Sequence, residues 1–237
     1  MRHGPARFWT TVALSALLAM PARAGDAAAF YPLDSVRGLE AVRQPADRGP
    51  EVVTYRGRKS VHLIQVTPPK DAGSGGSGAL LALVTGSDFG DGTIEVDLVG
   101  RPRAGAPPDV RGFVGLAFRI QPGGAYECFY IRQTNARARD QLRRNHSTQY
   151  VSEPEFPWYR LREESPGVYE SYVDLEPEAW TRLKIVVSGA QAELYVNGAS
   201  QPALIVNELK HGLSRGQLAL WVGSDTEAYF SNLRVSR

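Results

Sequence analysis

The chain has 237 residues, a formal net charge of +2 and a single cysteine. Three of its 27 Lys and Arg residues lie in the first 24 positions, which leaves 24 basic against 25 acidic residues in the remainder. This balance gives no basis for nucleic-acid binding, and one cysteine excludes an intrachain disulfide. We therefore expect no nucleic-acid partner, and we expect Cys128, inside a strand-like run, to be a buried apolar side chain.

Residues 1–24 have the features of a secretory signal peptide. A basic start and a largely apolar run at 8–20 precede the sequence Ala-Arg-Ala at 22–24, which matches an A-x-A cleavage site. The apolar run is too short for a stable membrane span, and no later run reaches the length needed. The sequence therefore predicts a periplasmic or secreted protein without membrane insertion, with one domain over residues 25–237.

The remainder of the chain shows strand patterns and almost no helical periodicity. Short apolar or alternating runs recur between Gly, Pro and Asn turns, at 52–55, 61–66, 79–84, 92–99, 112–120, 126–133, 181–187, 190–196, 216–222 and 228–235. Strands without intervening helices predict an all-β fold, an antiparallel β-sandwich of the jelly-roll kind. Residues 100–109 carry three prolines and two glycines, and we interpret them as a loop without chemistry.

Side chains alternate across a strand, so each predicted strand divides into two faces. Val114, Leu116 and Phe118 share one face, and the next strands also have one aliphatic or Phe face. Their opposite faces mix small residues with Arg, Tyr and Trp, which indicates a shallow ligand-sized concavity. The alternative is that the arginine-rich segment folds over this face as a cover. The run at 181–187 alternates apolar with charged residues, as in a sheet with a solvated outer face.

The segment 129–162 contains seven arginines, His146 and several Tyr and Trp rings, with little hydrophobic periodicity. Long irregular segments inside compact domains are uncommon and are usually functional or disordered. Arginine, histidine and aromatic side chains together bind planar, hydroxylated or anionic ligands. The alternative is a solvated loop whose arginines pair with neighbouring glutamates. The predicted ligand-binding residues are Arg119, Tyr130, Arg132, Arg144, Trp158, Tyr159, Arg160 and Trp221.

The C-terminal half contains four strand-like motifs, WTRLKIVV at 180–187, AELYVNG at 192–198, GQLALWVG at 216–223 and YFSNLRV at 229–235. In this order they resemble the C-terminal half of concanavalin A-like lectin/glucanase domains. The run GLAFR at 115–119 and the tyrosine-containing run at 126–132 are similar to the bacterial laminin-G-like and 3-keto-disaccharide hydrolase (domain of unknown function 1080) group. The resemblance covers most of residues 30–237. It implies a concanavalin A-like jelly roll with a carbohydrate ligand.

The superfamily contains lectins, glycoside hydrolases, polysaccharide lyases and adhesion modules. The fold alone therefore does not determine the activity. Family 16 glycoside hydrolases carry an E-x-D-x-x-E strand, whereas the nearest match here, with Glu95 and Asp97, lacks the last glutamate. Double displacement needs two carboxyl groups about 5 Å apart, so we do not expect this mechanism. Jelly-roll polysaccharide lyases use Arg or Asn to neutralise a uronate, with His and Tyr as base and acid. That parallel implies catalytic roles for His146, Tyr150 and Arg143.

From these observations we expect an exported carbohydrate-binding domain that acts on a glycan or saccharide. The first alternative is a glycoside hydrolase of the 3-keto-disaccharide hydrolase type, or a polysaccharide lyase, that uses His146 with neighbouring Arg and Tyr. The second alternative is a non-catalytic structural or adhesion module. No metal-ligand spacing is present and no cofactor is expected. Related folds often bind calcium, so a calcium ion stays an alternative.

Overall fold

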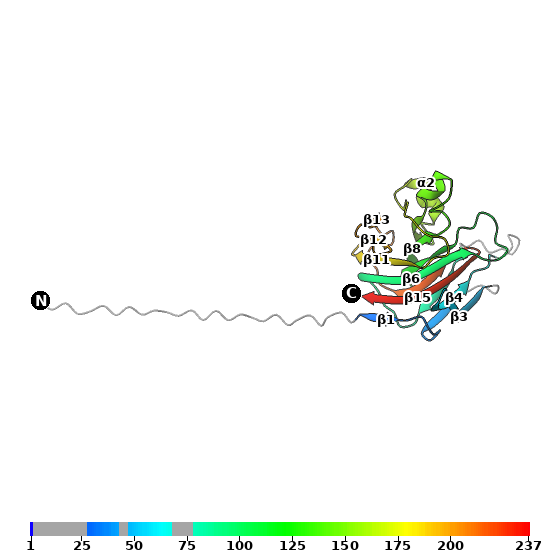
Figure 1. Ribbon diagram of the computed structural model, residues 1–237. Helices are drawn as coiled ribbons and strands as arrows, with labels where there is room; N and C mark the ends of the chain where they lie inside the picture. The colour runs from blue at the N-terminus through cyan, green and yellow to red at the C-terminus, as the bar shows by residue number, and fades with distance from the viewer. Residues whose placement is uncertain (2–27, 43–46, 68–77) are drawn as a thin grey trace.

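The computed structural model describes residue 1 and residues 28–42, 47–67 and 78–237 (Figure 1). In these ranges the chain forms two antiparallel β-sheets packed face to face, with two short helices at one end of the molecule. This confirms the predicted all-β antiparallel sandwich. The predicted signal peptide, apart from its first residue, lies outside the described residues. Across the described ranges, neither helix has the length and apolar character of a membrane span.

Eight strands form one sheet. They are β1 (Ala29–Tyr31), β3 (Arg48–Tyr55), β4 (Arg58–Ile64), β6 (Gly92–Pro102), β11 (Thr181–Ser188), β12 (Gln191–Val196), β13 (Leu204–Val206) and β15 (Thr226–Ser236). Their order is β13-β12-β11-β6-β15-β4-β3, and β1 pairs with β15. This sheet contains both the first and the last strand of the described chain.

Seven strands form the second sheet. They are β2 (Leu39–Val42), β5 (Leu80–Val84), β7 (Phe113–Ile120), β8 (Tyr126–Arg132), β9 (Thr148–Glu153), β10 (Glu170–Ser171) and β14 (Gln217–Val222). Their order is β10-β9-β8-β7-β14-β5-β2. The helices α1 (Gln141–Asn145) and α2 (Trp158–Glu164) lie in the connections on either side of β9.

The core lies between the sheets and consists of the aliphatic and Phe faces of their strands. Val114, Leu116 and Phe118 of β7 are at most 1% exposed and belong to this core. Phe118 stacks on Phe129 of β8 with ring centroids 6.2 Å apart. The two-faced pattern expected for the central strands is therefore confirmed, and burial of this face supplies the main stabilisation of the sandwich.

The outer face of the seven-stranded sheet carries a second apolar cluster, which includes Ala117, Tyr130 and Trp221. Cys128 is completely buried there, as expected, and burial raises the pKa of its thiol well above the ordinary value. The outer face of the eight-stranded sheet differs, because on β11 the exposed Arg182 alternates with buried residues. Among the described residues, the apolar outer cluster that includes Tyr130, next to the arginine-rich segment, lies on the seven-stranded sheet.

The segment 129–162 is more regular than expected, because it contains β9 and both helices. β9 shows no apolar alternation in the sequence, since its buried positions include Thr148 and Gln149. Helix α1 begins where the Asp140 side chain accepts a hydrogen bond from the backbone nitrogen of Arg143 at 3.0 Å. The expectation of a fold without helices was therefore wrong here. The sequence also missed β1, β2, β10 and β13, which are too short to show a period.

Gly115 lies on β7 where β8 passes so close that an added Cβ would stand 2.1 Å from the backbone oxygen of Phe129. We expect Gly115→Ala to lower the free energy of unfolding by about 1–3 kcal/mol, because the two strands must move apart. Gly123→Ala is the matched control, since its added Cβ meets no atom within 4 Å. Urea denaturation measures both, and equal stability of the two variants would contradict the close approach.

Candidate functional site

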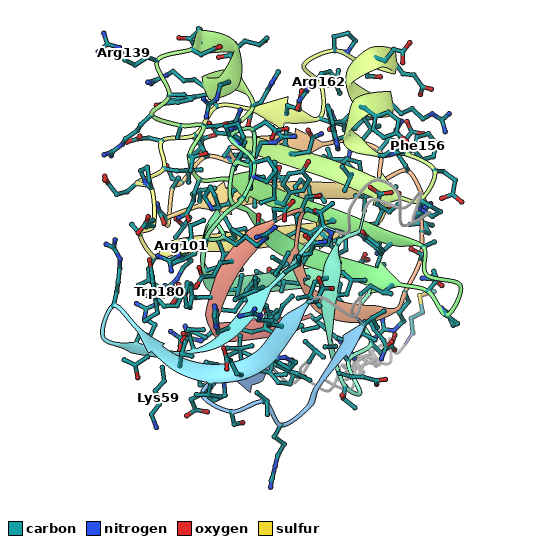
Figure 2. The ribbon with its side chains drawn as sticks, turned by 90° about the vertical axis from the view of Figure 1, so that its right-hand side faces the viewer. Lys59, Arg101, Arg139, Phe156, Arg162 and Trp180 are labelled. Atoms are coloured by element: carbon teal, nitrogen blue, oxygen red, sulfur yellow. The ribbon has the colours of Figure 1, made fainter. Side chains whose placement is uncertain are left out.

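Two adjoining hollows lie over the outer face of the seven-stranded sheet. The larger has a volume of ≈ 600 Å³ and the smaller of ≈ 180 Å³. Phe113, Tyr130, Trp158 and Ser224 line both, so we treat the two as one outer-face groove. Figure 2 shows the two helices at the top of the molecule with Arg162 between them. The larger hollow is lined by residues of both helical segments and of the loop before β7.

The floor of the outer-face groove is an aromatic layer. Tyr130 of β8 stacks on Trp221 of β14 with ring centroids 4.7 Å apart, and Phe113 meets Tyr130 edge-on at 6.3 Å. The indole nitrogen of Trp221 donates to the Tyr126 hydroxyl at 3.2 Å. Tyr130 and Trp221 are only 3% and 8% exposed, so they shape the groove but leave a ligand little of their surface. Burial raises the pKa of Tyr130 to about 12, so its hydroxyl stays uncharged well above neutral pH.

Arg132 is the centre of a buried polar network beside this floor. Its guanidinium donates to the Tyr130 hydroxyl at 3.0 Å, to Gln149 Oε1 at 2.9 Å and to the His146 carbonyl at 3.1 Å. Its ion-pair partner is Glu170 of β10, with Nη1 and Oε1 3.3 Å apart. A buried charge needs such partners to be tolerated, and here they fix the position of the Arg132 side chain.

Glu170 connects this network to α2 and to the end of α1. Arg162 of α2 donates from Nε to Glu170 Oε2 at 2.9 Å and from Nη2 to Oε1. The Nε2 atom of His146 lies 3.3 Å from Oε2 of the same carboxylate, whose side chain is 3% exposed. One buried carboxylate therefore positions two guanidinium groups and one imidazole around the larger hollow.

His146 follows α1 and lines the larger hollow. Burial lowers its pKa below the ordinary value, and the charges of Arg162 and Arg132 act in the same direction, against the opposing effect of Glu170. The ring is therefore mainly neutral near pH 7. A neutral imidazole held by a carboxylate can accept a proton from a bound ligand.

The rim of the outer-face groove exposes side chains that have free surface. Trp158 and Tyr159 of α2 are 43% and 61% exposed, and the guanidinium of Arg162 lies 4.7 Å from the Trp158 ring centre. Asn135 also lines the larger hollow and donates from Nδ2 to the His146 carbonyl at 3.0 Å. Its Oδ1 atom is buried and has no hydrogen-bond partner among the described residues. The groove thus combines exposed rings with an unused acceptor.

Arg119, predicted as a ligand-binding residue, does not reach the outer-face groove. Its side chain is 1% exposed and pairs with Asp91, with Nη2 and Oδ1 2.9 Å apart. It also donates to the carbonyls of Gly90, Gly189 and Gly212. These contacts tie loops together away from the groove, so the position of Arg119 favours a structural role.

Tyr150, predicted as a catalytic residue, lies in the core between the sheets with 0% exposure. Its hydroxyl donates to Glu127 Oε2 at 2.6 Å and accepts from the backbone nitrogen of Lys210 at 2.8 Å. Burial, and then the charge of Glu127, raise its pKa. Alternation along β9 turns Gln149 outward and Tyr150 inward. Tyr150 therefore cannot act on a ligand in the groove, and we leave it out of the proposed site.

Arg144 and Arg160 also point away from the outer-face groove. Arg144 donates to the Tyr172 hydroxyl at 3.1 Å and lines a separate hollow of ≈ 410 Å³. Arg160 pairs with Glu164 at 2.7 Å, and its guanidinium lies 4.4 Å from the ring centre of Phe156. Successive residues on a helix point about 100° apart, so the adjacent arginines of α1 point in different directions. Of the two arginines on α1 that were predicted as site residues, Arg143 lines the groove.

Sequence reasoning missed several residues that line the groove. Arg111 and Asp109 belong to the loop before β7 and line the larger hollow, so the end of the predicted loop 100–109 reaches the candidate site. The first three residues of that predicted loop belong to β6. Glu153 ends β9 and lines the smaller hollow. No local pattern marks these residues, because only the register of β9 and the path of the loop bring them to the groove.

Two observations bear on metal and carboxylate chemistry. Within the ranges that the structure describes, no group of three or more His, Cys, Asp or Glu side chains is placed to hold a metal ion. Glu95 and Asp97 of β6 face away from the core, on the sheet opposite the groove. Asp97 is paired there with Arg58 at 2.8 Å and Arg182 at 2.9 Å. These two carboxylates therefore take no part in the site.

No protein-family model matches the chain, and no curated protein matches it either. Solved structures match it in fold. The carbohydrate-binding module CBM66 from Bacillus subtilis is 15% identical with a TM-score of 0.50, over 84% of this chain and 96% of that chain. A Bacillus licheniformis β-glucanase is 13% identical with a TM-score of 0.50, over 91% and 100%. A prokaryotic β-1,3-1,4-glucanase (lichenase) from a mouse hindgut metagenome is 10% identical with a TM-score of 0.52, over 88% and 98%.

At these identities the likeness establishes the fold alone, and function must be argued from the site. The narrower similarity to the 3-keto-disaccharide hydrolase group stays a prediction from the sequence. The two stacked antiparallel sheets and these neighbours give the chain the concanavalin A-like jelly-roll fold.

Proposed function

We propose that this protein binds a saccharide in the outer-face groove. The observation that carries the proposal is the buried, unpartnered Oδ1 of Asn135 in a hollow that the exposed ring of Trp158 also lines. A sugar supplies both complements, since its hydroxyl groups donate hydrogen bonds and its C–H face packs on an indole. The fold neighbours include a carbohydrate-binding module and two glucanases, which agrees with this proposal.

The groove is also held in shape before a ligand arrives. Trp158 lies under the guanidinium of Arg162, which is itself fixed by the buried carboxylate of Glu170. A ring held in this way loses little conformational freedom on binding, so more of the contact energy appears as affinity. Tyr159 extends the exposed aromatic surface along the smaller hollow.

A second candidate function is catalysis on the bound saccharide, by hydrolysis or β-elimination. The observation that favours it is the imidazole of His146, which lines the same hollow and lies 3.3 Å from Glu170. In this proposal His146 moves a proton to or from the sugar, and the buried carboxylate holds the orientation of the ring. Tyr150 has no part in it.

Glu153 adds a titratable group to the smaller hollow. Burial, and then the charge of Glu155, raise the pKa of Glu153 to about 7. Its carboxyl group forms no hydrogen bond or ion pair with another described residue. In its protonated form it donates to a sugar oxygen, so we include it in the proposed site.

Export belongs to the same proposal. The features of residues 1–24 favour a periplasmic or secreted protein, in which residues 25–237 form the single saccharide-binding domain. A saccharide outside the cytoplasm is then the proposed partner, without nucleic acid.

Trp158→Ala tests the binding proposal. We expect about a tenfold loss of affinity for any saccharide that the native protein binds, because the variant loses the exposed stacking surface. Tyr172→Ala is the matched control, since Tyr172 is also 43% exposed but lines the separate hollow beside α1. Isothermal titration against a glycan panel measures both. No binding by the native protein to any glycan would reject the proposal and leave a structural or adhesion module.

His146→Gln tests the catalytic candidate. We expect loss of product release from an oligosaccharide panel with little change in affinity, because glutamine keeps hydrogen bonding but cannot take up a proton. The lowered pKa of His146 predicts that activity persists below pH 6.5, the usual midpoint for histidine, before it declines with acid. If the native protein turns over a substrate and His146→Gln does not change the rate, His146 has no part in the mechanism.

Glu153→Gln tests whether the carboxyl group of Glu153 in the smaller hollow has a raised pKa in the folded protein. A carboxyl group whose pKa is raised in the folded state favours folding at low pH, and this contribution is lost as pH rises from about 4.5 to about 7. We therefore expect the variant to have a higher Tm than the native protein at about pH 8 and a similar Tm at about pH 4. Glu164→Gln, an exposed residue paired with Arg160, is the control. An equal Tm difference at both pH values would contradict the assignment.

A further inference from the structure

We propose that the larger hollow receives the anionic group of an acidic saccharide, a carboxylate or a sulfate, between the guanidinium groups of Arg143 and Arg111. This inference deepens the proposed function and rests on it. It begins with the observation that the four arginines that line the hollow are not equivalent. Two of them share the carboxylate of Glu170, whereas Arg143 and Arg111 form no ion pair with a described residue.

Arg143 of α1 lines the larger hollow. Its side chain forms no hydrogen bond and no ion pair with any residue in the described part of the chain. Its Nε atom is buried and has no hydrogen-bond partner there. A guanidinium donor removed from water without a partner costs free energy, so an acceptor that enters the hollow gains more than it would at an exposed arginine.

Arg111 approaches from the loop before β7. Its Nη1 atom donates to the carbonyls of Pro108 and Val110 at 2.7 Å and 3.1 Å, which holds the side chain in place. Burial lowers the pKa of Arg111, and the positive charge of Arg143 lowers it further, against a smaller opposing effect of Asp109. Arg111 and Arg143 line the same hollow, so an anion that enters between them is attracted by two positive charges.

The other charges of the hollow are matched except for Asp109, whose negative charge acts on Arg111. Arg132 and Arg162 share Glu170, and Asp225 pairs with Arg103, with Nη2 and Oδ1 2.6 Å apart. His146 is mainly neutral near pH 7, for the reasons given above. Arg143 and Arg111 thus bring two positive charges to the hollow against the single carboxylate of Asp109, so a net positive charge stays at the proposed pair.

The rest of the hollow indicates that the anion belongs to a sugar. The planar fork of arginine matches the two oxygens of a carboxylate and the oxygens of a sulfate. Trp158, with its exposed ring, and Asn135, whose Oδ1 has no hydrogen-bond partner among the described residues, line the same hollow and suit the C–H face and the hydroxyl groups of a saccharide. A volume of ≈ 600 Å³ lies within the usual range for a small-molecule site.

The test is isothermal titration with charged oligosaccharides and their neutral counterparts. The panel contains oligogalacturonate, oligoalginate and hyaluronan fragments with their carboxyl-reduced forms, and chondroitin sulfate fragments with their desulfated, carboxyl-reduced forms. We expect at least one charged member to bind about tenfold or more tightly than its neutral form. We also expect its affinity to fall as salt increases. If only the carboxylated ligands or only the sulfated ligands bind, the result identifies the anion that Arg143 and Arg111 accept.

Arg143→Gln and Arg111→Gln should each remove most of the preference for the charged ligand and its salt dependence. Arg143→Lys should restore part of it, because lysine keeps the charge without the planar fork. Arg139→Gln is the matched control, because Arg139 lies at the outer side of the molecule in Figure 2 and lines a separate hollow. Without ligand, Arg143→Gln should keep or raise the Tm, since it relieves repulsion with Arg111.

The outcomes separate this inference from the function on which it rests. Saccharide binding with equal affinity for charged and neutral forms would overturn the anion site and leave the proposed function standing. If neither Arg143→Gln nor Arg111→Gln changes the binding of the charged forms, the anion binds elsewhere, and the proposed anion site is also overturned. Absence of binding by every saccharide in the panel, charged or neutral, would reject the proposed function itself.

Discussion

Glu170 lies beneath the outer-face groove with its carboxylate shared by two guanidinium groups and one imidazole. These partners come from β8, from α2 and from the residue after α1, so one buried anion joins the elements that shape the larger hollow. Without it, Arg132 would be left as a buried, uncompensated charge, which is strongly destabilising. An electrostatic contact therefore joins the elements around the larger hollow, while apolar packing forms its floor.

The seven-stranded sheet buries apolar side chains on both faces, and this explains why a groove forms there. Its inner face packs against the opposite sheet, whereas its outer face carries the Tyr130 and Trp221 stack. The arginine-rich segment folds beside that stack. It therefore both covers part of the outer face and forms a wall of the groove. It hides the rings of the floor but leaves Trp158 and Tyr159 on the rim.

The seven arginines of the segment serve different purposes. Arg137 and Arg160 pair with carboxylates at the surface, which is the ordinary role of a solvated loop. Arg132 and Arg162 are structural members of the Glu170 network. Arg143 alone among these five combines a position in the groove with a side chain that lacks a protein partner in the described ranges. Its availability, rather than the density of arginine, makes it a candidate for binding.

The sequence by itself determined the sandwich, the two faces of the central strands and the burial of Cys128. These follow from alternation, a local property that any strand must obey to bury one face. It also directed attention to the segment that lines much of the candidate groove, because rings and arginines gather there within about thirty residues. It could not recognise β9, where buried polar residues hide the alternation.

Only the tertiary structure decided which of the predicted residues meet. Arg119 has the alternation of an outer-face residue, yet loop carbonyls and Asp91 surround it. Tyr150 and His146 are four positions apart, yet one lies in the core and the other in the groove. Arg111 arrives from a separate loop that no local pattern marks. The reason is physical: a site is defined by distances between groups far apart in the chain, and those distances depend on how loops cross the sheet.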